Sequence, residues 1–273
     1  MNSKKNYHIH FIALALLFVL GNACITAPSK TANEYNFLAF LVAGIAAIAV
    51  YGISCHITIN RLTLLPIWLL SFYCIADAFI TFAKFISDNL LPGSPRFLIV
   101  VPLAVILIYI SFKNVNVLLK FSLISGILAV GVIILFFVST LKDFDVKNVF
   151  IYRLPDASDF LEQLLPYVKS MVIPVVLLAV FGKIEQIKSL TAITGVAIGV
   201  VCFGLCILNA VLLFGIRFSA ILDYPYYSAG STVTFGYLFT RLDGFLYFLY
   251  LATVLVKSAV GIFVIKKSRE LIP

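Results

Sequence analysis

Long apolar stretches alternate with short polar connections along almost the whole chain. A bilayer core about 30 Å thick is crossed by a helix of roughly 20 mainly apolar residues. Runs of about this length recur, and several are apolar on every face, unlike the alternating strands of a barrel. The pattern predicts an all-α polytopic membrane protein with about eight transmembrane helices. The predicted helices cover residues 9–28, 36–57, 64–86, 96–112, 117–141, 160–181, 190–216 and 237–265.

The first apolar run is interrupted near its middle. Gly21, Asn22, Ala23 and Cys24 break the apolar pattern, and Pro28 closes the segment. Lipid offers the backbone no hydrogen-bond partner, so a break at membrane depth is tolerated only inside protein or beside a cavity. Helix ends at that depth present backbone dipoles to solutes in secondary transporters. The interruption therefore favours a membrane protein that binds a small solute.

Composition supports the membrane assignment and changes the interpretation of charge. The chain is 62% hydrophobic and 12% charged, whereas soluble domains carry roughly 25% charged residues. Its net charge of +8 is typical of basic loops beside anionic cytoplasmic lipid, and we expect no nucleic-acid partner. We interpret the N-terminal segment as an uncleaved first helix rather than a signal sequence.

Basic residues in the short connections favour a cytoplasmic N-terminus. With that orientation the eight predicted passes leave both termini in the cytoplasm. The cytoplasmic side then carries Lys4, Lys5, Arg61, Lys113, Lys120, Lys183, Lys188, Lys266, Lys267 and Arg269. We expect one membrane domain over residues 1–273, with a first half at 1–141, an outer loop at 142–163 and an incomplete second half at 164–273.

Four ionisable residues fall within predicted helices, where each costs about 2.5–3.5 kcal/mol to insert. Asp77 and Lys257 lie deep, and we predict that they form the centre of a proton or solute site; Lys84 and Lys169 lie nearer helix ends. The alternative is a structural ion pair, or lysines that reach toward the membrane surface. Pro174 would kink its helix and free a carbonyl group at membrane depth.

Other residue patterns limit the function classes. The chain has no His-Glu-x-x-His, Gly-x-Ser-x-Gly or phosphate-loop motif, and we expect neither an enzyme nor a bound cofactor or metal. The five cysteines lie in apolar runs and are interpreted as small packing residues. Gly195 and Gly199 have the spacing that lets helices pack closely.

Three segments then give the chain its resemblance to a known family. Residues 18–28 contain the glycine break and closing proline, residues 90–95 read Leu-Leu-Pro-Gly-Ser-Pro, and residues 224–243 contain Tyr224-Pro-Tyr-Tyr and Arg241-Leu-Asp. In order and spacing these segments resemble the endospore germination permeases, the B subunits of nutrient germinant receptors, within the amino acid–polyamine–organocation superfamily. Lys257 lies where members of this family often have a lysine.

This resemblance implies a leucine-transporter-type fold, with two inverted halves and broken helices 1 and 6 facing helices 3 and 8. The chain covers the equivalent of eight helices, so the implied fold is shortened. Family members bind amino acids or related germinants and act with an A subunit and a lipoprotein C subunit in the inner spore membrane. Carried onto this chain, the substrate-binding residues are Gly21, Asn22, Ala23, Cys24, Tyr73, Asp77, Pro174 and Lys257.

The resulting hypothesis is a germination permease-like subunit in the spore or bacterial cell membrane. It would bind a small nutrient, such as an amino acid, and signal to its partner subunits. Two alternatives remain at this point: a proton-coupled amino acid transporter that uses Asp77, and a structural membrane subunit without a ligand.

Overall fold

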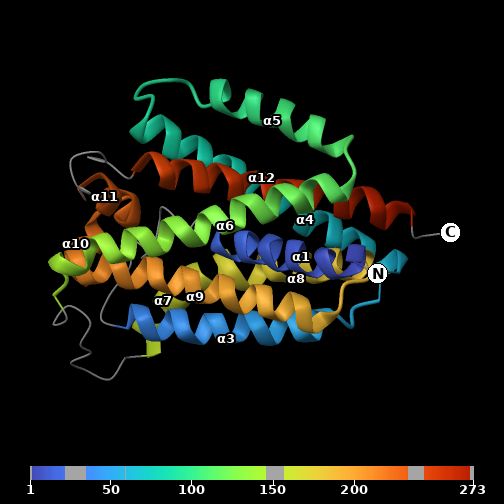
Figure 1. Cartoon of the computed structure of the whole chain (residues 1–273), viewed down its shortest axis with the longest axis horizontal. Helices are drawn as coiled ribbons and strands as arrows, with labels where there is room; N and C mark the ends of the chain where they lie inside the picture. The colour runs from blue at the N-terminus through green and yellow to red at the C-terminus, as the bar shows by residue number, and fades with distance from the viewer. Residues whose placement is uncertain (1, 22–34, 59, 146–156, 233–242, 271–273) are drawn as a thin grey trace.

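A computed structural model describes residues 2–21, 35–58, 60–145, 157–232 and 243–270 (Figure 1). In this part of the chain all regular structure is helical, as the sequence predicted. The main helices are α1 (Asn2–Leu20), α3 (Asn36–Ser54), α4 (Arg61–Asn89), α5 (Phe97–Ser111), α6 (Val115–Thr140), α7 (Ala157–Tyr167), α8 (Ile173–Ile184), α9 (Ser189–Phe214) and α12 (Asp243–Glu270). Shorter elements are η1 (Leu141–Asp143), η3 (Val168–Val172), α10 (Ile216–Ile221) and α11 (Pro225–Thr232).

Among the described residues, six helical segments are long and apolar enough to cross a membrane. These are α3, α4, α6 with η1, the segment from α7 to α8, α9 and α12. Two further apolar helices are shorter, namely α5 and the part of α1 at Tyr7–Leu20. α4 extends beyond the predicted 64–86 at both ends, and α12 continues to Glu270, while the predicted start of the last helix at 237–242 lies outside the described residues.

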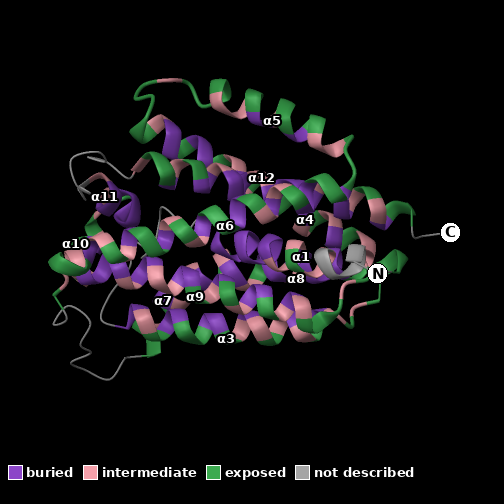
Figure 2. Ribbon diagram, viewed as in Figure 1, coloured by how far each residue is buried: buried purple, intermediate pink, exposed green. Residues whose placement is uncertain are grey.

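α1 lies inside the bundle, and its second half is buried (Figure 2). It packs against α6, α8, α9 and α12, and its residues from Ala13 to Leu20 are all buried. α5 is the opposite case, because it lies at the edge of the bundle and buries only Leu103 and Leu107. Its remaining apolar surface is stable where lipid covers it.

Small residues bring α1 and α9 together, as expected from the glycine spacing. A Cβ atom on Gly195 would lie 2.7 Å from Ala15 Cβ, and one on Gly199 would lie 2.8 Å from Val19 Cβ. Separations this short exclude any side chain at these two positions unless the helices move apart. Without a hydrophobic driving force in lipid, such close backbone packing is a main source of helix association.

The connections that share one end of the bundle carry a cluster of basic residues. Tyr7 near the start of α1 donates a hydrogen bond to Glu185 after α8, and Lys267 in the last turn of α12 pairs with the same carboxylate. Lys183 donates to the carbonyl of Ile57 after α3. We call this the basic end; it includes Arg61, Lys113, Lys183, Lys188, Lys266, Lys267 and Arg269.

The sixth predicted helix is continuous, which corrects the expectation of a second broken helix. α7, the π-helical segment η3 and α8 follow one another without an interruption from Ala157 to Ile184. The N–H of Ile173 bonds to the carbonyl of Val168, five residues earlier, so the turn before Pro174 is widened. Proline can offer no N–H at the next position, and the wide turn absorbs that loss without unwinding the helix.

Candidate functional site

α1 ends inside the bundle at the predicted interruption. Leu20 is its last residue, and Gly21 follows with φ of +40°, a conformation that other residues adopt at a cost. The Gly21 N–H closes the last turn on the carbonyl of Leu17, at 3.1 Å. Asn22, Ala23 and Cys24, which complete the predicted break, lie outside the described residues.

Two residues of α12 pack directly on this helix end. The Thr253 hydroxyl donates a hydrogen bond to the Gly21 carbonyl at 3.2 Å, in addition to its bond to Tyr250 within α12. The side chain of Lys257 fills the space beside Gly21, since a Cβ there would lie 2.7 Å from Lys257 Cε. Thr253 and Lys257 are one turn apart, so one face of α12 closes the end of α1. The sequence singled out Lys257 on this helix and not Thr253, although the position of Thr253 four residues earlier was a usable signal.

Lys257 is buried, with only 5% of the residue exposed. Its ammonium group lies 5.9 Å from the centre of the Phe18 ring, within range of a cation–π interaction. It also lies at the C-terminal end of α1, where the helix dipole presents partial negative charge. The backbone and ring of α1 therefore supply the environment that a buried cation needs.

Asp77 forms an ion pair with Lys169, one of the three lysines within predicted helices that could neutralise it. Its carboxylate lies 3.5 Å from the ammonium of Lys169 in the π segment η3. The Lys169 side chain is 60% exposed and that of Asp77 is 28% exposed. Lys84, two turns further along α4, is exposed and has no ion pair among the described residues. The widened turn at η3 thus holds the cation that neutralises Asp77.

The described residues of the candidate site form two groups, one where α12 meets the end of α1 and one between α4 and η3. The helix-end group consists of Gly21, Thr253 and Lys257. The ion-pair group consists of Asp77 and Lys169, with partly exposed Tyr73 one turn before Asp77 on α4. Cys74 is buried on α4, three residues before Asp77.

Pro174 is the remaining predicted site residue, and it is buried at the start of α8, directly after η3. Pro174 therefore lies on the same continuous helical segment as Lys169 of the ion-pair group. The described residues contain no cluster of three or more His, Cys, Asp or Glu that would hold a metal ion. The chemistry that both groups offer is charge recognition and backbone hydrogen bonding.

Comparison with known proteins identifies the family. A search among curated proteins finds no match. The family model described as spore germination protein matches residues 63–272, a span that includes Tyr73, Asp77, Pro174 and Lys257. Gly21 and the rest of α1 and α3 precede the matched span. With most of its length matched and its apolar helices in place, the chain belongs to the spore permease family of spore germination proteins, a family of integral membrane proteins.

Proposed function

We propose that this chain is a germinant receptor subunit that binds a small nutrient within the membrane and signals its presence to partner subunits. One observation carries the proposal. The Asp77–Lys169 ion pair lies near the middle of two long apolar helices, yet both side chains remain partly exposed. Charges at such depth face the bundle interior or a water-filled cavity, because contact with lipid is costly. The pair therefore favours an aqueous or ligand-filled space beside α4 and η3.

The chemistry of the pair matches a free amino acid. A zwitterion carries one ammonium and one carboxylate, and Asp77 and Lys169 present the complementary charges. The helix end at Gly21 and the buried cation Lys257 form the other group of the candidate site. In secondary transporters, helix ends of this kind contribute backbone dipoles to solute binding. In this arrangement the ligand ammonium would replace Lys169 as the partner of Asp77, and the ligand carboxylate would remain near a lysine.

The signal follows from differential affinity. A ligand shifts an equilibrium between two conformations only as far as it binds one of them better. An amino acid that separates Asp77 from Lys169 would change how α4 packs against the segment from η3 to α8. We propose that the A and C subunits of a germinant receptor detect this change, and that the basic end faces the cytoplasm.

Thermal unfolding of the purified protein tests the proposal with each amino acid in turn. Ligand at about 100 times its Kd stabilises by roughly 2.7 kcal/mol, so a specific nutrient should raise Tm clearly. Asp77→Asn should abolish the shift, while the control Lys84→Gln, on the same helix but outside the pair, should retain it. Absence of a shift with every amino acid would favour the structural subunit without a ligand.

A second test addresses the role in spores. Deletion of the gene should remove the germination response to one class of single nutrients, and reintroduction should restore it. Proton-coupled transport is the second candidate, favoured by a carboxylate at membrane depth. Uptake of labelled amino acid into proteoliposomes, lost in Asp77→Asn, would support transport; binding without uptake would support signalling.

A further inference from the structure

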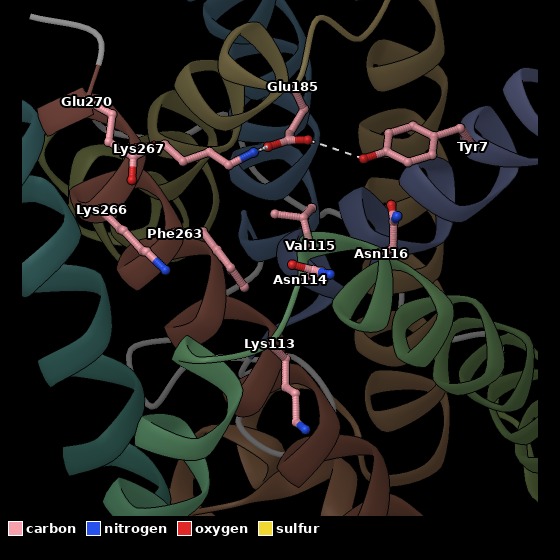
Figure 3. Close-up of a pocket in the computed structure, with 10 residues that line it drawn as sticks. All are labelled: Tyr7, Lys113, Asn114, Val115, Asn116, Glu185, Phe263, Lys266, Lys267 and Glu270. Atoms are coloured by element: carbon pink, nitrogen blue, oxygen red, sulfur yellow. Dashed lines mark hydrogen bonds and ion pairs between the residues drawn. The ribbon is translucent and has the colours of Figure 1, made fainter.

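A cavity of about 390 Å³ opens at the basic end, distant from the predicted nutrient site (Figure 3). It lies where the start of α1, the connection between α5 and α6, the end of α8 and the last turns of α12 meet. Its lining is dominated by polar and charged side chains from these four places. Lys113, Lys266 and Lys267 are among them.

One of its two glutamates is already neutralised. The Glu185 side chain is 9% exposed, accepts a hydrogen bond from Tyr7 at 3.2 Å and forms an ion pair with Lys267. Figure 3 shows Glu185 with its partners Tyr7 and Lys267 on one side of the cavity. The side chains of Lys113 and Lys266 point away from Glu185. Glu185 therefore fixes three helices to one another and does not oppose an incoming anion. Glu270, the other glutamate, is exposed in the final turn of α12.

Two cations are left for a ligand. Lys266 has no ion-pair or hydrogen-bond partner among the described residues. The Lys113 ammonium lies 4.7 Å from the centre of the Tyr109 ring and forms no ion pair within the same part of the chain. Between them lies the start of α6, where Asn114 is extended and its side chain caps no backbone N–H. The first N–H groups of a helix lack intrahelical partners and favour a nearby anion. The cavity thus combines two available ammonium groups with open backbone donors.

We propose that this cavity binds the phosphate headgroup of an anionic phospholipid. The membrane position argues for a lipid rather than a soluble phosphate. The cavity lies at the ends of membrane-spanning helices. Tyr109 in the last turn of α5 and Phe112 just after this helix are both exposed near Lys113, and α5 lies at the edge of the bundle. Aromatic side chains of this kind occupy the lipid headgroup region, and basic pockets between helix ends recognise anionic headgroups.

The test is a titration of the purified protein with short-chain phosphatidylglycerol, with phosphatidylcholine and inorganic phosphate as separate arms. Trp68 is the single tryptophan, and its indole N–H donates to Ser268 at 3.1 Å, beside Lys267. Its fluorescence therefore reports on this end of the bundle, and native mass spectrometry counts the retained lipid independently. Lys113→Gln with Lys266→Gln should weaken phosphatidylglycerol binding by roughly twentyfold to thirtyfold.

The matched control removes the same charge from the same end of the bundle. Lys120→Gln with Lys188→Gln replaces two exposed lysines that do not line the cavity, and binding should change less than about threefold. Lys113→Arg with Lys266→Arg should retain binding. Equal losses in both double glutamine variants would show a general surface potential and overturn the proposal. Stronger binding of inorganic phosphate than of phosphatidylglycerol, or equal binding of phosphatidylcholine, would also overturn it.

Discussion

Lys257 and Lys169 are both lysines within long apolar helices, and the structure accommodates them in opposite ways. Lys257 is buried beside Gly21 at the end of α1, with its ammonium 5.9 Å from the centre of the Phe18 ring. Lys169 is largely exposed and pairs with the carboxylate of Asp77. One cation is thus stabilised by an interrupted backbone and the other by an opposite charge.

The two arrangements separate a cation with a fixed position from one that can exchange partners. Lys257 fits a space that only glycine at position 21 leaves open, so its position is determined by the backbone of α1. The 3.5 Å contact between Lys169 and Asp77 joins two side chains that both remain partly exposed and so can reach another partner. We therefore expect changes near Lys257 to alter the fold, and changes near Lys169 to alter ligand response.

The largest effect is expected for Gly21→Leu. A side chain at this position must adopt positive φ and displace Lys257, and we expect a loss of about 3–4 kcal/mol in unfolding free energy. Thermal unfolding in detergent measures it. Gly131→Leu is the control, because a Cβ at Gly131 meets no atom within 4 Å. Similar stability of the two variants would show that Lys257 does not hold the end of α1.

Asp77→Asn should follow, with a loss of about 1–3 kcal/mol. The change leaves Lys169 without its carboxylate at membrane depth, and an unpaired charge there is costly. Adding Lys169→Met should recover most of the stability, because the double variant removes both charges. Failure of this recovery would mean that the ion pair is not what neutralises Asp77.

A smaller effect isolates the contact between Gly21 and Lys257. Gly21→Ala should cost about 1 kcal/mol less in a Lys257→Ala background than in the wild type, because the shortened side chain no longer meets the added methyl group. The part of the cost that arises from positive φ should persist in both backgrounds. Fully additive effects in a double-mutant cycle would place Lys257 away from the helix end.

The sequence could predict the helical passes, the interruption at Gly21 and the close packing of Gly195 and Gly199, because each rests on a local residue pattern. It could not predict that Asp77 pairs with Lys169 rather than with Lys257. Both lysines lie on apolar helices, and only the packing of η3 against α4 decides between them. The continuous helix at Pro174 was also missed, since a widened turn before a proline has no sequence signature that separates it from a break.

A second polar pair on α4 offers a comparison with Asp77 and Lys169, because the partner of its carboxylate is a neutral phenol. The Tyr224 hydroxyl donates a hydrogen bond to Asp88 at 2.9 Å, just before α11 and outside the membrane-spanning helices. Burial raises the pKa of Tyr224 above its ordinary value of 10.0, and the bond to negatively charged Asp88 raises it further. The folded protein therefore favours the protonated phenol.

The stability from this group is fully present below pH 10 and is lost as the pH rises toward the higher pKa of the folded state. Tyr224→Phe should cost about 1 kcal/mol at neutral pH, and the difference from the wild type should shrink above pH 10. Thermal unfolding across this range measures the change, with the exposed Tyr109→Phe as control. A difference that stays constant with pH would show that the phenol proton is not held by Asp88, and that this pair depends on packing alone.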